Sequence, residues 1–158
     1  MDSRQFRNAM GKFATGVTVI LTENDGDIHG MTANAFMSVS LDPMLVVISI
    51  GEKARILNKI RESGIFTVNI LSEEQEELSM MFAGQLKEKR KVEFERLDEK
   101  PVLPGALAQV ACEVTSEYKE GDHTLFVGKV TGIHLPEEEK DPLIFYGGKY
   151  RSIEKTHV

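Results

Sequence analysis

The sequence predicts a single mainly β domain, an antiparallel β-barrel with short helices, and three observations predict it. The chain has 158 residues, 41% of them hydrophobic, so it can bury one core and we expect one domain over residues 1–158. Six or seven short segments have strand-like patterns with turn signals between them. Strand and helix patterns do not alternate regularly, which argues against a parallel βαβ fold.

The strand candidates differ in how they are expected to be buried. Residues 18–22 and 28–31 flank Asn24-Asp25-Gly26-Asp27, a strong hairpin signal. Residues 44–50 form a nearly continuous apolar run after Pro43, which predicts a buried strand at the centre of the sheet. The remaining strand candidates are residues 66–71, 108–118, 125–130 and 143–146.

Three short helices are expected between these strands. Near the N-terminus, Phe6, Met10 and Phe13 recur at helical spacing, with Ser3 as the predicted cap and Gly16 as the predicted end. A second helix is expected over residues 54–61, and a third should follow the acidic turn that starts at Ser72. Each is short enough to cover the barrel rather than form a layer of its own.

Composition and missing motifs exclude several kinds of function. The formal net charge of -6 opposes generic nucleic-acid binding, and no leader or apolar run of membrane length is visible, so we expect a cytoplasmic protein. Cys112 is the only cysteine and no metal-binding pattern occurs, so we expect no metal site. In the expected hairpin Cys112 pairs with Lys129, ~20 Å from His123, and belongs to the core. The GxGxxG and GxxxxGK[ST] loops are also missing, so any nucleotide must be held differently.

Three segments are candidates for chemistry. Residues 30–43 are rich in small and hydroxyl-bearing side chains, which expose backbone donors and acceptors suited to the edge of an isoalloxazine ring; the alternative is an ordinary surface loop. Lys53 lies where a strand gives way to a helix and could meet a phosphate, or could simply be solvated. His123 follows a Gly-Asp turn and could be functional or structural. Residues 87–91 are basic but are interrupted and flanked by glutamates, which favours a solvated face or mobile loop.

Taken together, the segments resemble the short-chain flavin reductases of the FMN-binding split-barrel superfamily, over nearly the whole chain. The resemblance is carried by FRNAMG (6–11), FATGVTV (13–19), GMTANAF (30–36), SVSLDP (38–43), GDH (121–123) and GGKY (147–150). It is strongest to the reductase components of two-component phenol or 4-hydroxyphenylacetate monooxygenases. It implies a six-stranded antiparallel split barrel, a homodimer, and an enzyme that reduces FAD or FMN with NAD(P)H, preferably NADH, for a partner oxygenase.

The resemblance also implies roles for individual residues. His123 and Tyr150 would lie beside the nicotinamide and the flavin ring, with His123 orienting the nicotinamide, and Phe82 would cover the cofactor groove. The ring and ribityl chain would be lined by Thr32, Ala33, Asn34, Ser38, Val39 and Ser40, and the phosphates would be met by Ser49, Lys53 and Ala54. Two alternatives stay open: a non-catalytic flavin- or haem-related binding module on the same barrel, and a phosphate-binding oxidase similar to pyridoxamine-phosphate oxidases.

Overall fold

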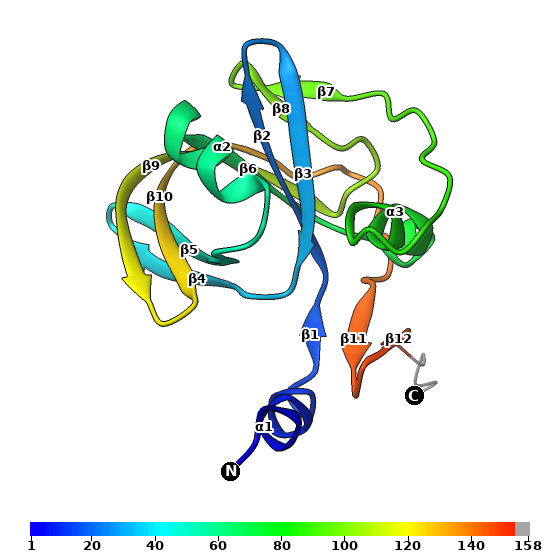
Figure 1. Ribbon diagram of the computed structural model, residues 1–158. Coiled ribbons are helices and arrows are strands. Elements are labelled where there is room, and N and C mark those ends of the chain that lie inside the picture. Colours follow the sequence, from blue (N-terminus) through cyan, green and yellow to red (C-terminus); the bar gives the residue numbers. More distant parts are fainter. Residues whose placement is uncertain (154–158) are drawn as a thin grey trace.

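The main feature of the fold is one strongly curled antiparallel sheet of seven strands (Figure 1). The computed structural model describes residues 1–153. The strand order in the sheet is β3-β2-β6-β9-β10-β5-β4. Their bounds are β2 Thr18–Asn24, β3 Asp27–Ala33, β4 Phe36–Leu41, β5 Met44–Gly51, β6 Ile65–Ile70, β9 Ala108–Glu120 and β10 His123–His134.

The two edge strands of this sheet, β3 and β4, are consecutive in the chain, and this connection forces the curl. If the sheet were flat, its edges would lie ~29 Å apart at about 4.8 Å per strand. The link consists of Asn34 and Ala35 alone, so Ala33 and Phe36 lie within ~11 Å of each other. The edges therefore meet at one end without pairing, which is an open, split barrel. The predicted barrel class is confirmed, and β4 adds a strand to the six that were expected.

Both predicted hairpins form, and their turns have the expected geometry. Asp25 and Gly26 have φ of 48° and 84°, as a two-residue turn between β2 and β3 requires. In the β9–β10 hairpin, Gly121 has φ of 62°. Cys112 pairs with Val130 rather than with Lys129, because the turn is centred on Gly121 and Asp122 and the register shifts between Val127 and Gly128.

The expectation that residues 44–50 form a central strand was wrong. Strand β5 lies between β10 and the edge strand β4, whereas β9 is the central strand, flanked by β6 and β10. Only alternate residues of β5, such as Val46, Ile48 and Ile50, are fully buried, so one face of this strand is only half covered. A continuous apolar run did not distinguish the two faces.

Helix α1, Ser3–Met10, begins and ends earlier than the sequence suggested. Asp2 caps it, because its Oδ1 accepts a hydrogen bond of 2.7 Å from the Gln5 amide, and Gly11 ends it. The predicted cap Ser3 is already helical. Phe6 and Met10 lie on the helix and are 61% and 56% exposed, so the helix leaves its apolar side uncovered, whereas Phe13, predicted to belong to the helix, lies beyond its end and is 77% exposed.

Helix α2, Ile56–Ser63, closes one end of the barrel. It buries Ile56, Leu57 and Ile60 in a core shared with Phe66 and Phe126, and Gly64 ends it in the left-handed conformation. The turn η1, Glu73–Gln75, and helix α3, Glu76–Phe82, follow β6. No helix within residues 1–153 is long and apolar enough to span a bilayer.

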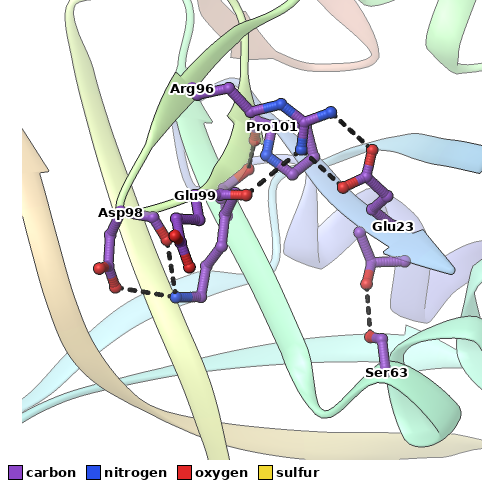
Figure 2. Close-up of polar contacts among 9 residues, drawn as sticks. Glu23, Ser63, Arg96, Asp98, Glu99 and Pro101 are labelled. Atoms are coloured by element: carbon purple, nitrogen blue, oxygen red, sulfur yellow. Dashed lines mark hydrogen bonds and ion pairs between the residues drawn. The ribbon is translucent and has the colours of Figure 1, made fainter. Parts of the chain in front are cut away.

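Two small sheets complete the fold. Strands β7, Glu95–Leu97, and β8, Lys100–Val102, form a hairpin fastened to β2 by Arg96, which binds Glu23 through two hydrogen bonds of 2.6 and 2.7 Å (Figure 2). The Arg96 guanidinium holds the pKa of Glu23 below its usual value. Strands β1, Thr15–Gly16, β11, Ile144–Tyr146, and β12, Lys149–Arg151, form a three-stranded sheet next to α1 (Figure 1).

The barrel is so tightly packed at Gly128 that we expect even a methyl group to destabilise it. A Cβ at this position would lie 2.5 Å from Phe66 Cζ and 2.9 Å from Cys112 Cβ. Gly128→Ala should lower the free energy of unfolding by about 1–3 kcal/mol, measured by urea denaturation without flavin. Gly16→Ala is the matched control, because its Cβ would have no neighbour within 4 Å and should change stability by less than about 0.5 kcal/mol. Equal effects of the two substitutions would contradict this packing.

Candidate functional site

A large cavity lies between α1 and the barrel. It has a volume of about 1160 Å³, and we call it the arm cavity because α1 and β1 supply much of its wall. The β11–β12 hairpin and the start of β10 close its other sides. It is lined by Phe6, Arg7, Asn8, Met10, Gly11, Lys12, Phe13, Thr15, Asn34, His123, Phe145, Gly147 and Gly148.

A second cavity, of about 690 Å³, lies at the end of the barrel where β3 passes into β4. We call it the barrel cavity. Its wall is mainly apolar, with a few hydroxyl and amide groups, which is the usual composition of a site for a flat organic ring. The lining consists of Phe13, Ala14, Thr15, Gly16, Thr18, Asn34, Ala35, Phe36, Met37, Val47, Ile48, Ser49, Ile70 and Leu125.

The two cavities share a wall formed by Phe13, Thr15 and Asn34. Asn34 is there because the two-residue link between the sheet edges carries it, while β1 brings Thr15 by pairing with Phe145 of β11. Ligands in the two cavities would therefore be neighbours across this wall. The arrangement fits a reaction in which two bound rings exchange a hydride directly.

A smaller cavity, of about 160 Å³, adjoins Asn34 on the side of α3. Its wall is fixed by two hydrogen bonds through the buried Ser79. Thr32 Oγ1 donates to the Ser79 carbonyl at 2.6 Å, and the Ser79 and Tyr150 hydroxyls are hydrogen-bonded at 2.7 Å. Phe145 meets the Tyr150 ring edge to face. These contacts join β3, α3 and the C-terminal hairpin.

The structure gathers some of the candidate residues and separates others. Asn34 lines all three cavities, Thr32, Ala33 and Tyr150 line the smallest, Ser49 lines the barrel cavity and His123 lines the arm cavity. Ser38, Val39 and Ser40 line none of the three cavities and lie on the edge strand β4, where the register shifts between the two serines. An edge strand keeps unpaired backbone groups on its free side, so it can offer them to a ligand.

Lys53, Ala54 and Phe82 lie outside the three cavity walls. Lys53 and Ala54 belong to the turn after β5, where the Ala54 amide is already bonded to the Gly51 carbonyl at 3.0 Å. Phe82 points into the protein and packs on Gly30, where a Cβ would lie 2.6 Å from its ring. Its neighbour Ala83, with Gln85, lines the smallest cavity instead.

His123 is held at the mouth of the arm cavity by a turn and by a side-chain contact. It begins β10 opposite Gly51, and the Glu52 amide donates to the Asp122 carbonyl at 2.9 Å. His123 Nδ1 lies 2.8 Å from Asp122 Oδ1, a contact that lowers the pKa of the Asp122 carboxyl. Because a carboxylate only accepts, Nδ1 carries the proton in this contact, and Nε2 of the neutral ring is free to accept a hydrogen bond.

Cys112 takes no part in this site. It is fully buried in the barrel core, and burial raises the pKa of its thiol to about 12. A thiol in this environment stays protonated near neutral pH and is inert as a nucleophile.

Sequence reasoning missed Phe13, Thr15 and Phe145 as site residues. The Thr15 hydroxyl gives the clearest structural signal, because it is enclosed and has no hydrogen-bond partner within residues 1–153. The segment FATG (13–16) belongs to the family resemblance, but the resemblance implies no role for any of its residues. Only the pairing of β1 with β11, two residues long, brings these side chains to Asn34.

Known proteins similar to this chain in sequence and in fold are flavin reductases. Residues 10–154 match the flavin reductase like domain. An NADH-dependent flavin reductase from a Rhodococcus species is 46% identical over 151 residues, covering 94% of this chain and 85% of the relative. The reductase component of 4-hydroxyphenylacetate 3-monooxygenase from Thermus thermophilus is 40% identical over 148 residues, covering 94% and 95%. The solved structure of the flavin reductase PheA2 in its native state is 59% identical, with a TM-score of 0.95, and covers 98% of this chain and 100% of that one.

The protein is thus a split-barrel protein with two adjacent cavities that share a wall. The chain belongs to the flavin reductase like family, and the family and flavin reductase class that its sequence predicted are confirmed.

Proposed function

We propose that the chain binds FAD or FMN in the barrel cavity, reduces it with NADH bound in the arm cavity, and supplies the reduced flavin to a separate oxygenase that acts on an aromatic compound. The observation that carries this proposal is the shared wall of Phe13, Thr15 and Asn34 between the two cavities. The names of the relatives support the donor and the partner, since they include an NADH-dependent flavin reductase and a reductase component of a monooxygenase.

The barrel cavity fits a flavin ring. Phe36, Ile48 and Leu125 offer apolar cover, while Thr18, Asn34 and Ser49 add polar groups at a few points. The exposed backbone of the segment that links β3 to β4 offers donors and acceptors to the pyrimidine edge. When bound, the flavin supplies the N5 position that accepts a hydride from nicotinamide C4. Six residues are the ones we place along the ring and ribityl chain. Asn34 lines the barrel cavity, Thr32 and Ala33 line the adjoining smallest cavity, and Ser38, Val39 and Ser40 follow on β4.

Lys53 is the cation we place at the flavin phosphates. It lies in the turn that follows β5, directly beyond Ser49, whose side chain lines the barrel cavity. Lys53 is exposed, and Ala54 follows it shortly before α2 begins. Phe82 and Tyr150, which we place over the flavin groove and beside its ring, lie on the side of the smallest cavity, which is lined by Tyr150 and by Ala83, the neighbour of Phe82.

His123 is the residue we place at the nicotinamide. Its side chain is 49% exposed, so a planar ring can reach it from the arm cavity. With Nδ1 bound to Asp122, Nε2 can accept a hydrogen bond from the carboxamide of the donor. The protein needs no side-chain nucleophile, because its contribution is to hold two rings at reacting distance.

We also propose that the chain works as a homodimer in the cytoplasm. Phe6, Met10 and Phe13 on the arm are exposed, as are Met37, Val39 and Leu41 on β4. Two apolar surfaces of this kind on one small protein favour burial against a second copy. Both surfaces border the cavities, so the dimer contact and the ligand sites would lie close together.

The proposed activity is tested by following NADH oxidation at 340 nm with added FAD, FMN or riboflavin. We expect oxidation that depends on both the protein and the flavin, proceeds with chelator present, and yields reduced flavin that oxygen reoxidises. If the protein binds flavin but NADH is not consumed, the chain is a binding module and the proposed activity is wrong.

Removal of the Lys53 charge tests the phosphate site. Lys53→Ala should weaken binding of FAD and FMN by about 10- to 150-fold, the value of a charge-assisted contact worth roughly 1.5–3 kcal/mol, and leave riboflavin binding unchanged. Lys59→Ala, on α2, is a matched control. If flavin titration shows that the variant loses affinity for all three flavins equally, Lys53 does not contact the phosphates.

Removal of the His123 ring tests the nicotinamide site. His123→Ala should reduce kcat/KM for NADH by about 10- to 100-fold, which corresponds to roughly 1.4–2.7 kcal/mol, while flavin affinity and stability stay near those of the wild type. Anaerobic stopped-flow reduction across an NADH titration measures the effect. A variant that reduces flavin at the wild-type rate throughout would show that His123 is only a turn residue.

A further inference from the structure

The arm cavity is positively charged on a chain whose net charge is negative. Its charged lining residues other than His123 are Arg7 and Lys12, and within the described part of the chain no aspartate or glutamate lines it. The whole sequence, by contrast, has 25 acidic and 19 basic residues. The charge contrast is clearest against a separate surface cavity lined by Glu73, Glu74, Glu138, Glu139, Lys140 and Asp141. An isolated basic wall of this kind favours an anionic ligand.

Both cations are available to such a ligand. Arg7 donates from Nε to the Ser3 carbonyl at 3.4 Å, which leaves its two terminal nitrogens for other partners. Neither Arg7 nor Lys12 takes part in an ion pair with another residue among positions 1–153. A guanidinium on α1 and an ammonium two residues beyond its last residue, Met10, can together bind two linked phosphates.

The positions of the two cations indicate how a ligand would lie in the arm cavity. His123 and Asn34 line the barrel side of the arm cavity, whereas Arg7 and Lys12 belong to α1 and to the turn after it. A ligand that fills the cavity would have a ring at the barrel and negative charge at the arm. Phe6 and Phe13 are exposed on the same cavity wall and could stack on a second flat group.

We propose that Arg7 and Lys12 bind the pyrophosphate of the nicotinamide dinucleotide, so that α1 holds the hydride donor while its nicotinamide reaches the wall shared with the barrel cavity. This inference rests on the proposed function and extends it. The site is distinct from the one at Lys53, which follows β5 and does not line the arm cavity. The two nucleotides thus have separate phosphate contacts.

The test compares NADH with a hydride donor that has no phosphate, 1-benzyl-1,4-dihydronicotinamide. For Arg7→Ala and Lys12→Ala, we expect KM for NADH to rise about three- to tenfold each, and for the double variant about 10- to 100-fold, with kcat and flavin affinity unchanged. The rate with the benzyl donor should stay the same in all variants. Arg4→Ala, on the same helix and outside the cavity lining, removes the same charge and should leave KM for NADH unchanged.

Several results would overturn the inference. One is a KM for NADH that is unchanged in the double variant, and another is a rise in KM for the Arg4→Ala control equal to that of Arg7→Ala. A third is a loss of activity with the benzyl donor as large as the loss with NADH, which would make the arm a structural element. Sedimentation velocity adds a further check, because a double variant that changes its oligomeric state would assign the two residues to a contact between copies. A wild-type protein that oxidises neither donor would refute the proposed function instead.

Discussion

The two-residue link between the edges of the main sheet is the constraint on which the site depends. Because Asn34 and Ala35 alone connect β3 to β4, the seven-stranded sheet must curl until its edges meet at that end. The link itself then lies at the mouth of the barrel, with Asn34 in the wall of all three cavities. A longer connection would let the edges separate, and the barrel cavity would lose one side.

Around this fixed point, short elements supply the rest of the site. Strand β1 has two residues, yet its pairing with β11 brings Thr15 and Phe145 together and carries α1 to the cavity that it partly encloses. The β9–β10 turn positions His123 on the opposite side, with Asp122 holding Nδ1. In the proposed function, backbone geometry and a few polar side chains hold the rings and phosphates, which suits a hydride transfer that needs orientation more than acid–base catalysis.

Local signals in the sequence correctly predicted the turns, whose geometry depends only on neighbouring residues. The Asn24–Asp27 turn and the Gly121 turn were both found where the pattern placed them, because each needs a residue that tolerates positive φ. Predictions that depended on distant partners failed: β5 is not central, and Cys112 is one residue out of the predicted register. The predicted cap of α1 was wrong for a local reason, because Asp2 and Ser3 are adjacent and are similarly good cap residues. The meeting of Asn34 with His123 and Thr15 follows from strand order, which no local pattern encodes, and the family resemblance alone suggested that residues 34 and 123 share a site.

The proposed function requires that NADH is held in one fixed orientation beside a flavin bound on the same chain. Anaerobic stopped-flow reduction of bound flavin by NADH carrying deuterium at either the pro-R or the pro-S position of C4 tests it directly. A fixed orientation predicts a rate that saturates with NADH and a primary isotope effect with one of the two labelled donors only. Equal rates with both labelled donors, or flavin that is reduced only after it has left the protein, would contradict the account.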